Sequence, residues 1–183
     1  VWIPGVSIDF RVTSDVMVFG GVHRGFSPPG SGAGAEAELS VSYEAGARYT
    51  QGLVNVEAVG FLSDYSNLLG TDLTAGGGEG TGRLFNGGAV HAGGAEASIS
   101  LNAGPLVGWI ASVPLSITYT YTEARFQSHF RSDFGPWGTV EVGDFMPYLP
   151  QHQASASIGA ENGKFGVHLS TRYSSRVRTL AGQ

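Results

Sequence analysis

Along most of this chain, apolar residues alternate strictly with small or polar residues, in one segment after another. Successive side chains of a β-strand point to opposite faces, so this alternation predicts strands with one apolar and one polar face. Residues 5–12, 16–25, 39–50, 53–65, 87–102, 112–126, 153–161 and 164–175 fit such strands. Within this set, parts of 16–24 and 54–65 are apolar on both faces, so their register stays unassigned. We predict an all-β fold of about eight strands.

The same pattern limits how the chain could cross a membrane. The longest apolar candidate, residues 105–115, is interrupted by Gly108, Ser112 and Pro114. A spanning helix needs about 18 or more consecutive apolar residues. Without one, only a closed β-barrel satisfies the backbone hydrogen bonds in lipid. The 29 glycines and the 11% of aromatic residues also suit strands and turns better than helices.

The connections between the predicted strands alternate in length. Residues 13–15, 50–52, 103–111 and 162–163 are short connections, and residues 26–38, 66–86 and 127–152 are long ones. Asn162-Gly163 is a strong hairpin signal. Tight turns at one end and long loops at the other are typical of an up-and-down antiparallel outer-membrane barrel, with periplasmic turns and extracellular loops. A soluble β-sandwich remains the alternative, and it requires a second packed sheet.

Alternation also predicts which residues share a face of this barrel wall. The expected convex, lipid-facing set is Val6, Ile8, Phe10, Val41, Tyr43, Leu115, Ile117, Tyr119, Val167, Leu169 and Tyr173. The expected concave set is Glu44, Arg48, Glu96, Ser116, Thr118 and Arg172, and Asp9, Arg11, Glu57, Glu161 and Lys164 are also expected to face inward. Outward aromatic girdles are predicted from Phe10, Tyr49 and Phe165 at one boundary and from Tyr119, Tyr121 and Tyr173 at the other.

Several function classes find no support in the residues. The chain has no cysteine, and its net charge of −5 argues against a nucleic-acid surface. Its five histidines show no HxH or HExxH spacing, so no metal site or cofactor is predicted. The glycine-rich residues 30–35 fit a loose dinucleotide pattern but open no βαβ unit, and no GxSxG motif is present. We therefore expect no enzyme.

Seven motifs in order resemble one known family. They are the segments 19–29 (FGGVHRGFSPP), 42–49 (SYEAGARY), 57–68 (EAVGFLSDYSNL), 85–97 (FNGG with GGAEA), 119–124 (YTYTEA), 147–153 (PYLPQHQ) and 173–176 (YSSR). Together they resemble TonB-dependent receptors, especially siderophore receptors of the ferric-citrate type. The resemblance implies a barrel of 22 strands preceded by a plug domain. Residues 1–183 are thus expected to be a partial barrel domain, a C-terminal stretch without the plug, the TonB box and the remaining strands.

Cationic side chains gather at the end of the barrel that is predicted to be extracellular. The candidate ligand-binding residues are His23, Arg24, Arg83, Arg125, His129, Arg131, Arg176 and Arg178. Many iron chelates are anionic, and arginine offers a planar fork of donors to carboxylates. The alternative is that these cations pair with nearby acids, namely Asp64, Glu79, Glu123, Asp133 and Asp144.

The resemblance implies an outer-membrane receptor that imports a ferric chelate, such as a siderophore or ferric citrate. Its partners would be the membrane lipid and the TonB energy-transducing complex, which would act through the plug domain. A second hypothesis is a self-contained eight-stranded outer-membrane barrel that serves as an anchor or adhesin, closed by pairing 5–12 with 164–175. A third is a soluble carbohydrate-binding β-module.

Overall fold

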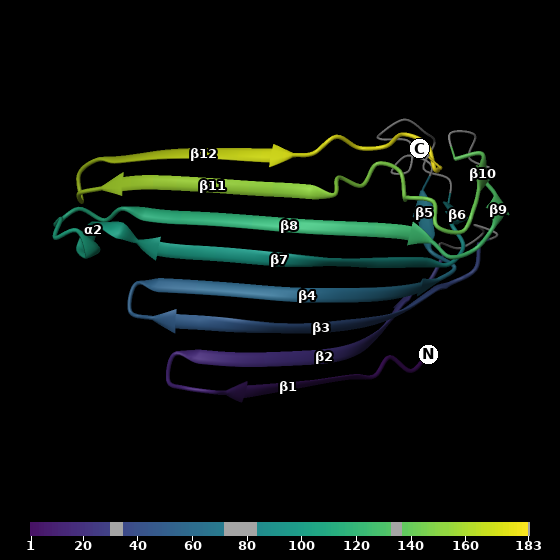
Figure 1. Ribbon diagram of the computed structural model, residues 1–183, viewed down its shortest axis with the longest axis horizontal. Helices are drawn as coiled ribbons and strands as arrows, with labels where there is room; N and C mark the ends of the chain where they lie inside the picture. Colours follow the sequence, from purple (N-terminus) through teal and green to yellow (C-terminus); the bar gives the residue numbers. More distant parts are fainter. Residues whose placement is uncertain (30–34, 72–83, 133–136, 183) are drawn as a thin grey trace.

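One large antiparallel sheet dominates the fold (Figure 1). The computed structural model describes residues 1–29, 35–71, 84–132 and 137–182. The sheet consists of β1 (Gly5–Arg11), β2 (Val16–Ser27), β3 (Glu38–Gln51), β4 (Val54–Ser66), β7 (Val90–Asn102), β8 (Pro114–Phe126), β11 (His152–Glu161) and β12 (Gly166–Ser174). Their order in the sheet is their order along the chain, as the alternation and the connections predict. The bounds differ from the predicted ones by at most three residues.

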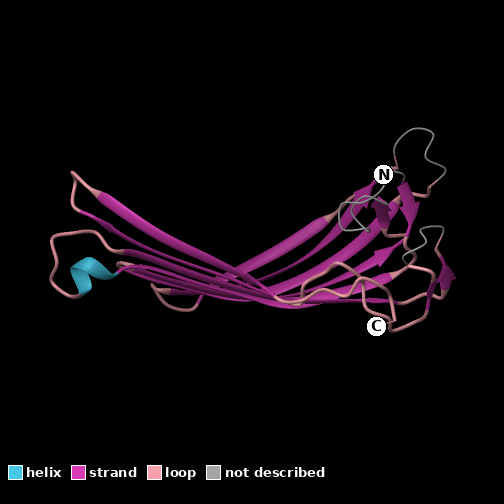
Figure 2. Ribbon diagram, turned by 90° about the horizontal axis from the view of Figure 1, so that it is seen from above, coloured by secondary structure: helices cyan, strands magenta, loops and turns pink. Residues whose placement is uncertain are grey.

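The sheet is a single open layer. Figure 2 shows it from the side as one bent and twisted layer, and β1 and β12 form its two opposite edges. The predicted closure of an eight-stranded barrel through residues 5–12 and 164–175 is therefore not formed. No second sheet packs across the eight strands in the described residues, as a soluble sandwich would require.

Short elements inside the predicted connections were not expected from the sequence. β5 (Leu69–Thr71) pairs with β6 (Leu84–Asn86), and β9 (Phe130–Arg131) pairs with β10 (Thr139–Val140). A single helical turn, α2 (Ala103–Leu106), begins after Asn102, whose side-chain oxygen accepts from the backbone N–H of Gly104. None of the helices in the described residues is long and apolar enough to cross a membrane.

The register sorts the side chains of the sheet onto two faces. Residues directly opposite each other in an antiparallel pair project to the same side. One row of such partners crosses all eight strands and reads Arg11, Met17, Arg48, Glu57, Ser98, Thr118, Ser155 and Arg172. The face that contains this row is called the polar face below, and the other is called the apolar face.

Both predicted sets of side chains are confirmed by this register. The residues expected to face lipid all share the apolar face, and Glu44, Glu96 and Ser116 share the polar face with the row above. The apolar face is largely uncovered, since Ile8 is 75% exposed and Val167 is 72% exposed. An apolar face of this size is characteristic of contact with a membrane or another protein.

The turn between β11 and β12 differs from the predicted two-residue hairpin. Residues 162–165 form a four-residue connection, so Lys164 lies in the turn and not at an inward strand position. The side-chain oxygen of Asn162 accepts from the backbone N–H groups of Lys164 and Phe165, at 3.2 and 3.0 Å. Gly163 has a positive φ of 82°, whereas Asn162 does not have the positive φ that a two-residue type I′ turn needs.

The buried core lies at one end of the sheet, where the long loops are. It consists of Val90, Ala124, Phe126, Trp137 and Val140, named the mouth cluster below. The Phe126 ring meets the Trp137 ring edge to face, with centroids 5.1 Å apart. Because Val90 and Phe126 are register partners on the polar face, the loop that follows β8 folds back over this face.

Candidate functional site

Two of the predicted arginines meet at the rim of the sheet, at the end of β8. The guanidinium carbons of Arg125 and Arg178 each lie 3.8 Å from the centroid of the Phe145 ring. Phe145 is held here because residues 143–146 run beside the end of β8, where Arg125 and Phe145 form a β-bridge.

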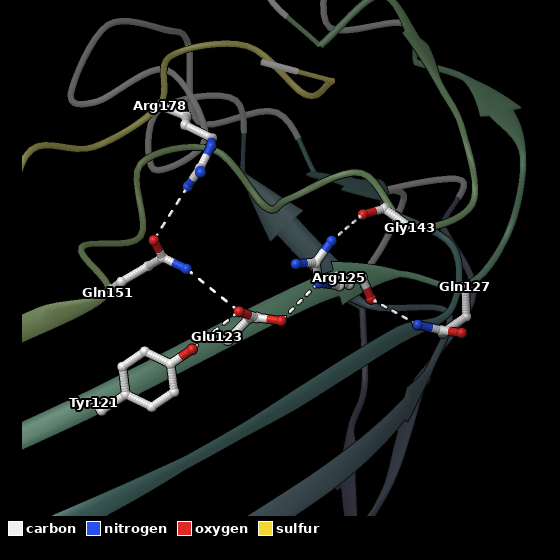
Figure 3. A network of polar contacts seen from close by, with 7 residues as sticks. All are labelled: Tyr121, Glu123, Arg125, Gln127, Gly143, Gln151 and Arg178. Carbon is white, nitrogen blue, oxygen red and sulfur yellow. Dashed lines mark hydrogen bonds and ion pairs between the residues drawn. The ribbon is translucent and has the colours of Figure 1, made fainter.

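The Glu123 carboxylate on β8 connects Arg125 to Tyr121 and to Gln151, which precedes β11 (Figure 3). Glu123 accepts from the Nε of Arg125 at 2.6 Å and from the Tyr121 hydroxyl at 3.0 Å. Gln151 donates to Glu123 and accepts from Arg178, both at 3.5 Å. Arg125 also donates to the carbonyl of Gly143 at 3.0 Å. Tyr121, Glu123 and Arg125, together with Gly143, Phe145, Gln151 and Arg178, are called the rim network below.

The rim network lies on the apolar side of the sheet. Glu123 and Arg125 are register partners of Gly93 and His91, and His91 is in turn the partner of Asp64. Arg24 is on the same side, opposite Val41, and is exposed. Asp64 lies 2.7 Å from the imidazole of His91. A row with charged side chains therefore crosses the apolar face at its long-loop end, and the aliphatic residues of that face lie between this row and the short turns.

The two predicted histidines, His23 and His129, do not contact the rim network. His23 projects from the polar face of β2, where its Nε2 lies 3.2 Å from a carboxylate oxygen of Glu44 on β3. His129 lies in the loop after β8, with its Nδ1 2.8 Å from the Glu141 carboxylate. Both imidazoles are therefore held by acids.

The remaining candidates are not brought together. Arg131 is exposed on β9, and Arg176 is exposed beyond the end of β12. Arg83 lies outside the described residues, as do the predicted acids Glu79 and Asp133. The described residues include no group of three or more histidine, aspartate or glutamate side chains that could hold a metal ion.

Sequence reasoning missed Phe145, Tyr121 and Gln151 as members of the rim network. One signal was present, because residues 126–149 are richer in aromatic and aliphatic side chains than a solvated loop requires. The parity of the alternation is a second signal: Tyr119, Tyr121, Glu123 and Arg125 are spaced by two along one strand.

The rim network can supply positive potential and some unused donors. A guanidinium has five N–H donors, and the hydrogen bonds of Arg125 to Glu123 and Gly143 use only part of them. Glu123 offsets part of the charge.

Residues 1–183 match the family model described as TonB dependent receptor-like, beta-barrel. Three solved structures share the fold. The ferric yersiniabactin uptake receptor FyuA from Yersinia pestis is 20% identical, with a TM-score of 0.63 over 92% of this chain and 24% of that one. The ferric citrate transporter FecA in its unliganded form is 19% identical, with a TM-score of 0.69 over 94% and 25%. The siderophore receptor PirA from Acinetobacter baumannii is 16% identical, with a TM-score of 0.63 over 96% and 30%.

This chain spans less than a third of the length of each of these receptors. Among curated proteins, none matches it.

Proposed function

Because this chain belongs to the TonB-dependent receptor β-barrel family, we propose that it forms part of the wall of a receptor that imports a ferric chelate. Barrels of this family lie in the bacterial outer membrane, and their members are transporters rather than enzymes. The chelate would be a siderophore or ferric citrate, and uptake would be driven through a plug domain coupled to TonB.

The observation that carries this proposal is the division of eight strands into two faces. An exposed aliphatic face, interrupted by few charges below the rim, suits lipid contact. The polar face contains charges that lipid would not tolerate, such as Arg48 and Glu57. The two unpaired edges, β1 and β12, would pair with further strands of the same barrel wall. Residues 1–183 would then be one part of the barrel domain.

Uptake by cells tests this function. A strain that lacks the complete gene, and the same strain with the gene restored, would be grown under iron starvation. Uptake of radioactive iron would be compared for ferric citrate, ferric hydroxamates and ferric catecholates, with cobalamin as a non-iron control. We expect gene-dependent uptake of at least one ferric chelate that stops when the proton gradient is dissipated. Uptake of cobalamin alone would contradict the proposal.

We propose that Arg125 and Arg178 act on ligand capture through their charge and not through direct contacts. Both are engaged by Phe145, and Arg125 also pairs with Glu123. Replacing both with glutamine in the full-length receptor should slow association of an anionic chelate and weaken its salt dependence. Arg11→Gln, at the opposite end of the sheet, is the matched control for loss of charge. A change in the dissociation rate alone would instead indicate direct contacts.

A further inference from the structure

The polar face changes its chemistry from one half of the sheet to the other. On β7, β8, β11 and β12 its middle positions are rich in short hydroxyls. These positions are Ser98, Ser100, Ser116, Thr118, Thr120, Ser155, Ser157 and Ser170, and they are called the hydroxyl lane below. One row, made of Ser100, Ser116, Ser157 and Ser170, has a hydroxyl on all four strands. The next row has hydroxyls on three strands, at Ser98, Thr118 and Ser155.

Few protein contacts satisfy these hydroxyls. Thr118 and Ser155 share a hydrogen bond of 2.7 Å. Ser98, Ser100, Ser157 and Ser170 are exposed and have no side-chain partner within the described residues. Hydroxyls both donate and accept, so water or a solute with either kind of group can complete them.

Among the described residues, fixed charges lie at the ends of the lane's rows. Glu96 on β7 ends the row of Thr120, and Arg172 on β12 ends the row of Thr118 and Ser155. His168 and Glu161 lie at its short-turn end, 3.0 Å apart. By contrast, the polar faces of β2 to β4 project the Arg48–Glu57 pair and the Phe19 ring.

A hollow marks the short-turn end of the hydroxyl lane. Its volume is about 610 Å³, and Ser100, Asn102, Ser116, Ser157 and His168 contribute to its lining. Ser100, Ser116 and Ser157 belong to the hydroxyl lane, and Leu101, Leu115 and Ile158 of the same strands also line the hollow. The hollow therefore continues the lane toward the turns.

We propose that the hydroxyl lane is the side of the wall along which a hydrated, oxygen-rich iron chelate passes. This inference rests on the proposed function. Passage requires contacts that are favourable enough to admit a solute and weak enough to release it. Exchangeable hydroxyl–water hydrogen bonds meet that requirement, while a row of unpaired arginines would hold an anion in place.

Single cysteines in the full-length receptor test the inference, because this chain has no cysteine of its own. Thr118→Cys places a thiol in the lane, and Met17→Cys places one in the same register row on the other half of the sheet. Ile117→Cys, on the apolar face, is the lipid-side control.

The first readout is the labelling rate with a small charged thiol reagent, which does not depend on transport. We expect Thr118→Cys to react about tenfold faster than Met17→Cys, since thiol reaction follows access. Equal or slower labelling at Thr118 would overturn the hydroxyl lane as a water-filled route, whatever the receptor imports.

The second readout is uptake of ferric citrate after a bulky maleimide has been attached. Labelled Thr118→Cys should lose most of its uptake and keep surface binding, while labelled Met17→Cys should keep both. Equal inhibition at the two positions, or none, would contradict a route along this side. If the unmodified receptor takes up no ferric chelate, the proposed function is wrong. The labelling rates then still show whether the hydroxyl lane borders a water-filled route.

Discussion

The polar faces of β2 to β4 and of β8 to β12 share one backbone geometry but hold their side chains differently. On the first, Arg48 pairs with Glu57, and the Phe19 ring lies against Gly46, its register partner. On the second, hydroxyls project from the polar face, and within the described residues one hydrogen bond joins two of them across strands, Thr118 to Ser155. Specific partners thus reinforce the register in the first half. In the second half the backbone ladder and the mouth cluster at its end do so.

The largest loss of stability is expected when the Phe126 ring is removed from the mouth cluster. Phe126→Ala should lower the free energy of unfolding of the full-length receptor by about 3–5 kcal/mol, since a fully buried phenylalanine leaves a cavity. Denaturant unfolding in detergent or lipid vesicles measures it. Ile117→Ala, on the exposed face of the same strand, should cost clearly less. Equal losses would show that the mouth cluster does not stabilise this half.

A smaller loss is expected from a methyl group placed under the Phe19 ring. The added carbon of Gly46→Ala would lie 2.6 Å from the Ala58 carbonyl and from the ring. Such overpacking costs about 1–3 kcal/mol. Gly60→Ala is the matched control on the next strand, because its nearest neighbours are 4.0 Å away. If both variants unfold at the same denaturant concentration, the ring does not fix the register.

Removing a serine hydroxyl from a hydrogen-bonded pair should lower the free energy of unfolding less than these changes, and by different amounts in the two halves of the sheet. Ser42→Ala leaves the hydroxyl of Ser63, a residue only 9% exposed, without its 2.8 Å partner, which costs about 1–2 kcal/mol. Ser155→Ala breaks the 2.7 Å bond to Thr118 where water can replace it, and should cost about 0.5 kcal/mol or less. Unfolding of the two variants side by side checks the order. A larger loss at Ser155 would reverse the comparison.

The smallest effect concerns the Arg48–Glu57 pair. These side chains are 48% and 34% exposed, so their coupling should be about 0.2–1 kcal/mol in a double-mutant cycle. It should weaken as salt is added. A coupling that salt leaves unchanged would mean that the pair is buried against another part of the full receptor.

The alternation of the sequence was sufficient to predict the sheet and its two faces, because parity alone decides which face a strand residue joins. The Tyr43 and Glu44 side chains went to opposite faces as expected. The turn at Asn162 could not be predicted as closely, since the side chain of that asparagine caps a four-residue turn instead of adopting a positive φ.

The site was predicted less well than the fold. The sequence placed Arg125 and Arg178 at the correct end of the sheet. Their meeting on Phe145 depends on how residues 143–146 fold back along β8. That path is set by long-range packing of Trp137 and Val140 against β7 and β8, which no local pattern encodes. The predicted alternative of pairing with acids holds for Arg125, through Glu123.

Every strand of the large sheet pairs only with the strand next to it along the chain. Each pairing therefore closes only the connection between two successive strands of the sheet, and the entropy cost rises slowly with the length of that connection. A sheet of this kind can fold by successive addition of hairpins. By the same logic, a wall could widen during evolution by duplicating one hairpin, since the new strands would need to match only their immediate neighbours.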